Sequence, residues 1–302
     1  MVSRFSLSET CRLNIPTSLA NDLLAAAESL PAYANEDYYS TELQIAIYQR
    51  VYQHCAEELD WLVKQVRELL NQQPYIALVS GLKFDKNHRL LVTLNRAFGV
   101  LVAGPYKKPR AQLIHYIQPA TDRPSAKSGH YGTELLHTDT ADWDPPVEII
   151  SMMCVRPDPH GGGNSLVLDI DSIRQEVINC LGSDVLQRLE SEKIPWQLPS
   201  YRGGGFVQRP ILTESTVCWR RYTIEQSVTA AGIQLSESFL TILDDFQALL
   251  ANTSRTLEFP MCAGEILFLN NWRTLHARTY IENAKASDRL MLRSWILTSD
   301  AE

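Results

Sequence analysis

The chain has 302 residues, of which 45% are hydrophobic and 21% charged, as in an ordinary globular protein with enough chain for a sizeable core. Its formal net charge of −7 argues against nucleic acid as the main partner, because phosphate binding needs basic patches. The six cysteines are scattered, the start carries no long apolar segment and no run approaches eighteen apolar residues, so we expect free thiols, no membrane contact and a cytoplasmic location.

Helices dominate the first part of the chain. Residues 17–30, rich in Ala and Leu, predict a helix that ends at Pro31. A longer helix is expected over about 41–71, where apolar residues recur at helical spacing. The run 75–81 is typical of a strand closed by glycine, and 88–97 is expected to form a short helix.

The middle of the chain combines strands with a long polar loop. Residues 111–117 alternate as a strand does and place His115 beside apolar neighbours, which indicates a core histidine. Residues 121–134 are polar, contain His130 and have no periodicity, so they form either a lid over a site or a solvated connection. The strongly apolar run 147–155 then predicts a buried strand.

Strands and helices continue to the end of the chain. A strand is expected from Ser165, followed by a helix that Asp171 caps and that runs to about Leu181. Residues 195–210 hold three consecutive glycines, but no Gly-Lys-Ser/Thr follows, so they form a loop or a cover over a site rather than a phosphate-binding loop. Ser236 caps another expected helix. Further strands are expected over 217–222, 255–259, 265–270 and 289–298.

Strands outnumber helices in the middle and at the end, with helices at the front and between strands. This composition is typical of a mainly β fold with helical cover, of the α+β class. No repeat, linker or low-complexity segment divides the sequence. We therefore expect one domain over residues 1–302, with a helical part over about 1–74 and a β core over about 75–302.

Residues 135–141, Leu-Leu-His-Thr-Asp-Thr-Ala, are the stretch most suited to chemistry. On a strand, His137 and Asp139 would point to the same side, and an imidazole beside a carboxylate is two-thirds of a metal site. A 2-His-1-carboxylate set with open positions suits non-haem Fe(II) oxygenases, so a distant histidine must supply the third ligand. His276, after a strand and a short polar break, fits better than His130, because a mobile loop makes a poor metal site.

Two arginines follow the distal histidine. Arg289 and Arg293 share one face of a predicted strand with Met291. Guanidinium groups on a face otherwise suited to burial need anions to pair with. This strand therefore predicts bound anions.

These features follow one another in a characteristic order. The pair His137-x-Asp139 is followed by the glycine step Gly-Gly-Gly-Asn-Ser over 161–165, then by an Asn-x-Arg-x-x-His-x-Arg-like segment around His276, then by Arg289 about a dozen residues beyond. This order resembles the Fe(II)/2-oxoglutarate-dependent oxygenases of the taurine dioxygenase and clavaminate synthase-like superfamily. The resemblance spans about residues 75 to 297. It implies a double-stranded β-helix (jelly-roll) core with the metal near one open end.

The resemblance also implies a reaction. His137, Asp139 and His276 would hold Fe(II), while 2-oxoglutarate would take two open positions and O2 the third. Arg289 would pair with the far carboxylate of 2-oxoglutarate, because a guanidinium keeps its charge when buried, and Ser165 would add a hydroxyl hydrogen bond. Oxidation of an unactivated C–H bond in a small molecule would release succinate and CO2. Hydroxylation is the default outcome, with desaturation and cyclisation open.

Several residues are candidates for holding the substrate. In relatives an arginine at the place of Arg293 often grips an acidic group, and a structural ion pair is the alternative here. Trp143 and Asp142 could line the mouth of the pocket, with packing as the alternative for Trp143. Arg221 is a further basic candidate, with a solvated strand edge as its alternative. The Thr-Ala after the ligand pair favours the amino-acid-oxidising branch, often found in natural-product pathways, so the expected partner is a small molecule.

The sequence departs from the family pattern at one position near the distal histidine, and two other classes of protein could also carry these residues. Asn270 stands where many relatives have Asp before the distal histidine, so an amide replaces a carboxylate there. Asp139 is present, whereas the family's halogenases lack this carboxylate. A Zn hydrolase could use the same three ligands, but the chain lacks His-Glu-x-x-His and a hydrolase gives no reason for Arg289. A non-catalytic cupin-like binding protein would be free to lose a ligand.

Overall fold

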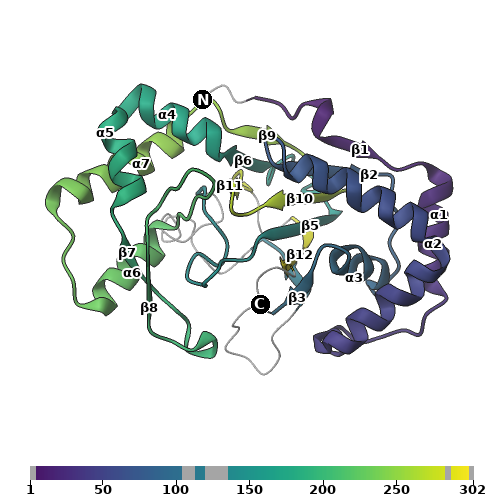
Figure 1. Ribbon diagram of the computed structural model, residues 1–302. Helices are drawn as coiled ribbons and strands as arrows, with labels where there is room; N and C mark the ends of the chain where they lie inside the picture. The colour runs from purple at the N-terminus through teal and green to yellow at the C-terminus, as the bar shows by residue number, and fades with distance from the viewer. Residues whose placement is uncertain (1–4, 104–112, 120–134, 283–286, 299–302) are drawn as a thin grey trace.

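The computed structural model describes residues 5–103, 113–119, 135–282 and 287–298 (Figure 1). The expected helices near the N-terminus are α1 (Thr17–Glu28), α2 (Thr41–Leu70) and α3 (Arg89–Arg96), and α2 is kinked at Cys55. Short 3₁₀ helices lie at η1 (Glu9–Cys11), η2 (Asn35–Tyr39) and η3 (Ser200–Arg202). Within the described ranges, no helix combines the length and apolar character needed to cross a membrane.

A mixed sheet runs through the middle of the molecule. Its spatial order is β1 (Arg12–Asn14), β2 (Ile76–Ser80), β10 (Ile266–Asn270), β5 (Ile149–Arg156), β12 (Leu290–Leu297) and β3 (Val100–Val102), and β4 (His115–Ile117) also pairs with β12. The β1–β2 pairing is parallel, and the other pairings of this sheet are antiparallel. Neighbouring strands come from distant parts of the sequence, so the sheet assembles side chains that the sequence keeps apart.

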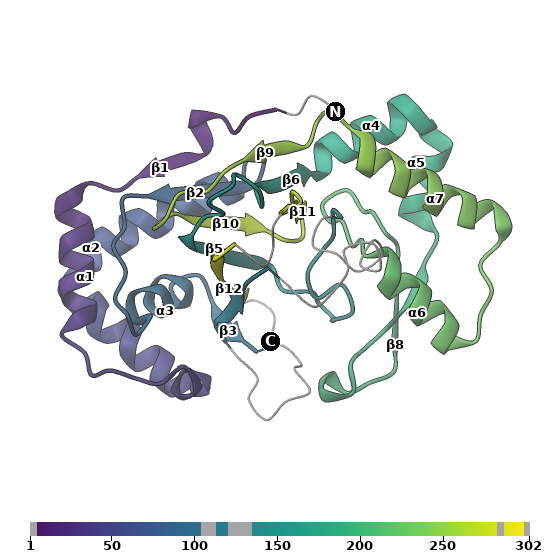
Figure 2. The same ribbon diagram turned by 180° about the vertical axis from the view of Figure 1, so that it is seen from behind.

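A smaller sheet and a second group of helices complete the fold. The strands β11 (Thr274–Arg278), β6 (Ser165–Asp169) and β9 (Leu257–Phe259) pair antiparallel in that order. The helices α4 (Ile170–Leu181), α5 (Ser183–Ser191), α6 (Arg221–Ala231) and α7 (Glu237–Asn252) gather at the end of the molecule opposite α1, α2 and α3, as Figure 2 shows from behind. A hairpin of β7 (Ile194–Gln197) and β8 (Phe206–Arg209) lies with them.

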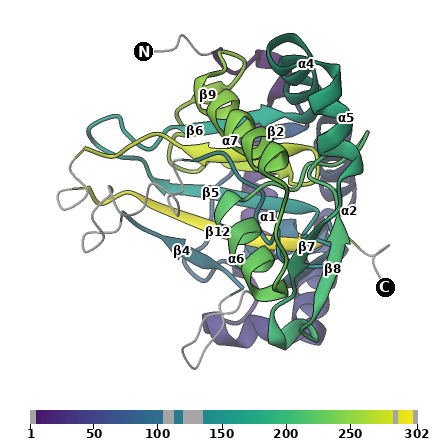
Figure 3. The ribbon, with the colours of Figure 1, turned by 90° about the vertical axis from the view of Figure 1, so that its left-hand side faces the viewer.

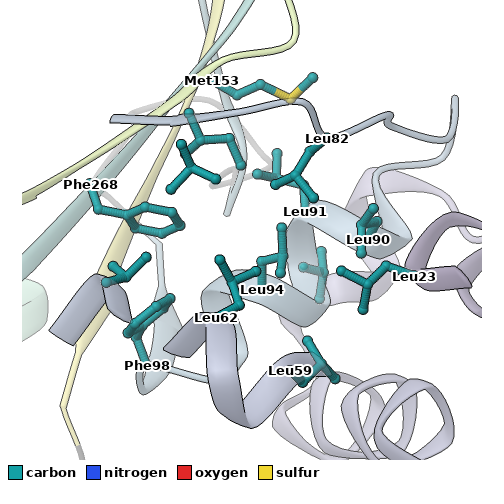
Figure 4. Packing of buried hydrophobic residues seen from close by; sticks show 14 of the residues in the cluster. Leu23, Leu59, Leu62, Leu82, Leu90, Leu91, Leu94, Phe98, Met153 and Phe268 are labelled. Carbon is teal, nitrogen blue, oxygen red and sulfur yellow. The ribbon is translucent and has the colours of Figure 1, made fainter. Parts of the chain in front are cut away.

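One face of the large sheet packs against the N-terminal helices. Strand alternation sends Met153, Phe268, Leu292 and Ile296 to this side, where they join a buried cluster with leucines of α1, α2 and α3. Figure 4 shows Met153 and Phe268 above these leucines. Burial of both sheet faces explains why strands such as β5 have near-continuous apolar sequences.

The other face of the large sheet looks toward the smaller sheet. Alternate residues of β2, β5, β10 and β12 form a second cluster with Val167 of β6 and Phe259 of β9, and we call this region the inter-sheet layer. Figure 3 shows β6 and β9 on one side of this layer and β5 and β12 on the other. Its members from the large sheet include Leu78, Ile150, Leu267, Met291 and Trp295.

The strand predicted over 217–222 is wrong. The structure has a single antiparallel bridge between Leu212 and Val217, and α6 begins at Arg221 after Arg220 in an extended conformation. The alternation of apolar residues correctly indicated burial, because Val217 and Trp219 lie in the core with the second group of helices. Burial of alternate residues does not require a paired neighbour strand.

Other expectations need smaller corrections. The segment 195–210 is mostly the β7–β8 hairpin, and its glycines form the connecting turn with φ of 66° to 92°. The cap of α4 is Asp169, whose side chain accepts from the Ser172 N–H, rather than Asp171. The helix α5 was not expected, and the residues 121–134 with His130 lie outside the described ranges.

Candidate active site

The two histidines of the predicted metal site are cross-strand neighbours. His276 lies in the middle of β11, and His137 forms an isolated antiparallel bridge with it through reciprocal backbone hydrogen bonds of 3.1 and 3.0 Å. The expected strand at the ligand pair is limited to this bridge, and a turn follows. The turn still brings Asp139 beside both rings, while Thr138 points away and hydrogen-bonds to the backbone of Val217 and Trp219.

The three side chains converge on one point. One ligand atom from each of His137, Asp139 and His276 lies within 4.8 Å of the others, and among the described residues no second group of this kind occurs. His137 Nε2 is 3.5 Å from Asp139 Oδ1, and His276 Nε2 is 3.8 Å from Asp139 Oδ2. His137 Nδ1 lies 2.7 Å from the Leu135 carbonyl oxygen, so it donates there and leaves Nε2 for a metal.

Burial and charge set the protonation of this group. Burial and the neighbouring His137 lower the pKa of His276 to about 3. Burial alone would raise the pKa of the Asp139 carboxyl, but Arg293, a hydrogen bond with His137 and the two imidazoles outweigh it and hold that pKa well below its usual range. A neutral imidazole and an ionised carboxylate are the forms that bind metals, and a donor set on one side of the ion suits facial-triad Fe(II). The residues therefore fit the metal.

Asn271 holds the backbone of the ligand turn. Its side chain accepts from the Asp139 N–H at 3.0 Å and donates to the carbonyl oxygens of Asp139 and Val147 at 3.0 and 2.8 Å. The departure from the family pattern, Asn270, instead closes its own turn by accepting from the Trp272 N–H at 3.1 Å. The amide at 270 thus shapes the turn before β11, and Asn271 fixes Asp139.

Replacing Asn271 with alanine is expected to destabilise the protein by about 2–4 kcal/mol, because three buried backbone groups lose their partner. Chemical denaturation of the metal-free protein measures the loss. Asn252→Ala is the control, since that exposed side chain donates to one backbone carbonyl at the end of α7. Equal stability of the two variants would contradict the role given to Asn271.

A cavity opens beside the ligands. It lies in the inter-sheet layer, between β6 and β11 on one side and β5, β10 and β12 on the other. In the smaller sheet, His276 is paired with Val167 and Arg278 with Ser165. The two pairs are two residues apart along their strands, so their side chains lie on the same face of the sheet, and three of the four are polar. The remaining walls are apolar, with Met152, Leu267, Leu269 and Ile117 among them.

Arg289 enters the same cavity just before β12. It is 5% exposed, and its Nη2 donates to the Gly163 carbonyl at 3.0 Å. Burial, and then the nearby Arg278, lower the pKa of Arg289. Among the described residues the Arg289 guanidinium pairs with no carboxylate. A buried cation with only a carbonyl partner fits a bound anion, and Ser165, also in the cavity wall, can donate to the same group.

Arg293 forms a structural ion pair, one of the two roles considered for it. Its Nη1 donates to Asp139 Oδ2 at 2.8 Å, and its Nη2 lies 3.4 Å from His115 Nδ1. Trp295, which the sequence analysis did not consider, donates from Nε1 to the same Oδ2 at 2.8 Å. A signal for it existed, since strand alternation places Trp295 on the face of Arg293. His115 is buried as expected, with its ring centroid 4.7 Å from that of Trp295.

Trp143 is a packing residue rather than a part of the pocket mouth. It is 1% exposed in the inter-sheet layer and is absent from the cavity wall. Its Nε1 donates to Tyr201 Oη at 2.8 Å, and the Arg202 guanidinium carbon lies 3.8 Å from its ring centroid. The loop after β7 therefore covers Trp143. Burial raises the pKa of the neighbouring Asp142.

Arg221 also has a different place from the one predicted. As the first residue of α6 it pairs with Glu225 and Asp244 at 2.8 Å, and it is not in the cavity wall. The charge of the preceding Arg220 helps to lower the pKa of His276 and partly offsets the burial that raises the pKa of Asp142. Arg220 was missed because residues 217–222 were expected to form a strand, and no helix was expected over 221–231.

Two imidazoles and a carboxylate at one side of an inter-sheet cavity, with a buried arginine farther along it, define a facial-triad non-haem iron enzyme. The chain also matches, over residues 40–295, the model of the family described as "Taurine catabolism dioxygenase TauD, TfdA family". It therefore belongs to this family of 2-oxoglutarate-dependent dioxygenases, and its cofactors are Fe(II) and 2-oxoglutarate.

Solved structures share the fold at low sequence identity. Asparagine oxygenase (AsnO) superposes with a TM-score of 0.74 at 15% identity, covering 96% of this chain and 94% of that one. The non-haem iron oxygenase OrfP, in complex with Fe and α-ketoglutaric acid, gives a TM-score of 0.68 at 16% identity, with 96% and 94% covered. A comparison with curated protein sequences gives no match.

Proposed function

We propose that this single-domain enzyme with a jelly-roll core hydroxylates an unactivated C–H bond of a small substrate derived from an amino acid. The observation that carries the proposal is the cavity with His137, Asp139 and His276 at one side and Arg289 with Ser165 farther along. When bound, Fe(II) and 2-oxoglutarate supply the oxidising chemistry with O2, yielding succinate, CO2 and one oxygen atom for the substrate. The protein's own part is to bind, orient and exclude water.

Each residue along the cavity has a separate task. His137, Asp139 and His276 hold the metal, and the apolar wall of Met152, Leu267 and Leu269 keeps water away from it. Arg289 would hold the far carboxylate of 2-oxoglutarate, and the Ser165 hydroxyl would add a donor to the same group.

The substrate proposal rests on charge as well as on relatives. AsnO has been solved with (2S,3S)-3-hydroxyasparagine and succinate, and OrfP with succinate and (3S)-hydroxy-L-Arg. A free amino acid carries a carboxylate and an ammonium group. Arg293, in the cavity wall, is a cation that suits the carboxylate. Arg293 has five N–H donors, of which Nη1 alone is used by Asp139.

The metal and cofactor are tested by anaerobic titration of the apo-protein with Fe(II) and then 2-oxoglutarate. Bidentate 2-oxoglutarate on facial-triad Fe(II) is expected to give a visible charge-transfer band near roughly 500–530 nm. Tight Zn²⁺ binding without that band would overturn the proposal in favour of hydrolase chemistry. The substrate class is tested by succinate formation with a panel of free L-amino acids, followed by mass spectrometry for one added oxygen atom. Turnover of none of them, despite the band, would refute the amino-acid assignment.

Gly163→Ala is expected to raise the KM for 2-oxoglutarate by about 10- to 100-fold. A Cβ at this position would lie 2.6 Å from Arg289 Nε, and the residue has φ +69°, so the arginine must shift. Succinate formation at varied 2-oxoglutarate measures the change.

Gly161→Ala is the matched control for that change. Gly161 lies in the same turn with φ +80°, but its Cβ would meet nothing within 4 Å. Both variants carry similar backbone strain, so only displacement of Arg289 separates them. An equal KM in the two variants would mean that the position of Arg289 does not determine cofactor binding.

A further inference from the structure

Trp295 is held rigidly beside the metal ligands. It lies on β12 and is 7% exposed, with its ring centroid 5.6 Å from Trp143 in an edge-to-face contact and 4.7 Å from His115. Its Nε1 donates to Asp139 Oδ2 at 2.8 Å. Aromatic contacts with two buried rings fix the indole, so the direction of this N–H is fixed as well.

The two oxygen atoms of Asp139 have different surroundings. Oδ2 accepts from both Trp295 Nε1 and Arg293 Nη1, each at 2.8 Å. Each carboxylate oxygen has about two lone-pair sites, so two donors occupy Oδ2. Oδ1 faces His137 Nε2 at 3.5 Å and accepts from neither of these donors.

We propose that Trp295 is a positioning residue that, together with Arg293, holds Oδ2 and so fixes the orientation of the Asp139 carboxylate toward the metal. The inference rests on the proposed function, because it concerns the same iron site. Arg293 supplies charge to this arrangement, and Trp295 supplies a neutral donor with a fixed direction.

Trp295 is the better residue on which to test this idea. Removing Arg293 changes both a hydrogen bond and the charge near a dication, and these two effects on metal affinity oppose each other. Trp295→Phe removes the N–H and leaves the local charge unchanged. The competing explanation is that Asp139 merely satisfies a buried indole N–H, in which case metal binding would not depend on the donor.

The experiment measures Co(II) affinity of the metal-free protein by its visible absorption, with thermal unfolding as a check on folding. Trp295→Phe is expected to weaken binding by about 10- to 100-fold, as loss of a partner of a metal ligand typically does. Trp295→Tyr should recover part of the Co(II) affinity, because the phenolic hydroxyl of tyrosine can donate to Asp139 in place of the indole N–H. Trp196→Phe is the control, since it removes an N–H from a fully buried indole that donates to the Arg209 carbonyl at 3.3 Å.

Each outcome bears on one claim. Wild-type affinity in Trp295→Phe, or equal affinity in the Phe and Tyr variants, would overturn the positioning role and leave the proposed function intact. Absence of Co(II), Fe(II) and 2-oxoglutarate binding by the wild type would overturn the proposed function itself. If Trp295→Phe does not fold, Trp295→Met replaces it as the variant without a donor, because methionine fills irregular space, and the comparison with Trp295→Tyr is unchanged.

Discussion

Replacing His276 with alanine is expected to lower Fe(II) affinity by more than about 100-fold and to abolish succinate formation. The change removes one of three converging ligand atoms, and two donors hold a divalent ion poorly. Anaerobic titration should show no charge-transfer band with 2-oxoglutarate at Fe(II) concentrations that saturate the wild type.

His54→Ala is the control for this loss, because His54 is an exposed residue of α2. It should bind Fe(II) as the wild type does. The two variants are compared only after thermal unfolding shows both to be folded. A His276→Ala protein that kept the band would require a ligand other than the three that converge here.

Replacing Arg289 with alanine is expected to weaken 2-oxoglutarate binding by about 10²- to 10³-fold, the cost of two charge-assisted hydrogen bonds. Fe(II) affinity measured without 2-oxoglutarate should stay unchanged, since Arg289 donates to Gly163 and does not contact the ligands. The 2-oxoglutarate affinity of Arg289→Lys should lie between those of the wild type and Arg289→Ala, because lysine keeps the charge but lacks the planar pair of donors of a guanidinium. Titration of the charge-transfer band measures the 2-oxoglutarate affinity, and anaerobic calorimetric titration with Fe(II) alone measures the metal affinity.

Arg156→Ala controls for the loss of an arginine from this region. Arg156 ends β5 and is exposed, and its guanidinium pairs with Asp288. Its removal should leave 2-oxoglutarate binding intact. An unchanged 2-oxoglutarate affinity in Arg289→Ala would move the anion site elsewhere in the cavity, with Arg278 as the next cation in its wall.

The sequence predicted the elements whose periodicity comes from burial on a defined face. The helices α2 and α7, and the strands β5, β6, β10 and β12, have such patterns, and they were located to within a few residues. The hairpin at 194–209 was missed because its strands have only four residues each, and the nearby Pro195 and three glycines have low strand propensity. The strand predicted over 217–222 failed because burial was mistaken for pairing.

In the candidate site, the metal ligands were predicted from the sequence, but several of the surrounding side chains were not. His137, Asp139 and His276 were predicted as a set, and they converge because β11 pairs with the ligand segment by one bridge. Strand alternation places Trp295 on the face of Arg293, but its contact with Asp139 could not be predicted, because that contact depends on where β12 lies relative to a turn more than 150 residues away. Trp143 was assigned from proximity in sequence and Arg221 from its charge, and neither determines the direction of a side chain near a turn.

The two faces of β12 tolerate substitutions more readily than insertions or deletions. Its alternate side chains serve the inter-sheet layer through Met291, Arg293 and Trp295, and the helix-side cluster through Leu292 and Ile296. A shift of one residue exchanges the two faces of a strand. Insertions or deletions within β12 would thus place leucine in the cavity and arginine among the helices. New substrate preferences on this strand can therefore arise by substitution, while changes in length are confined to the segment that joins β11 to it.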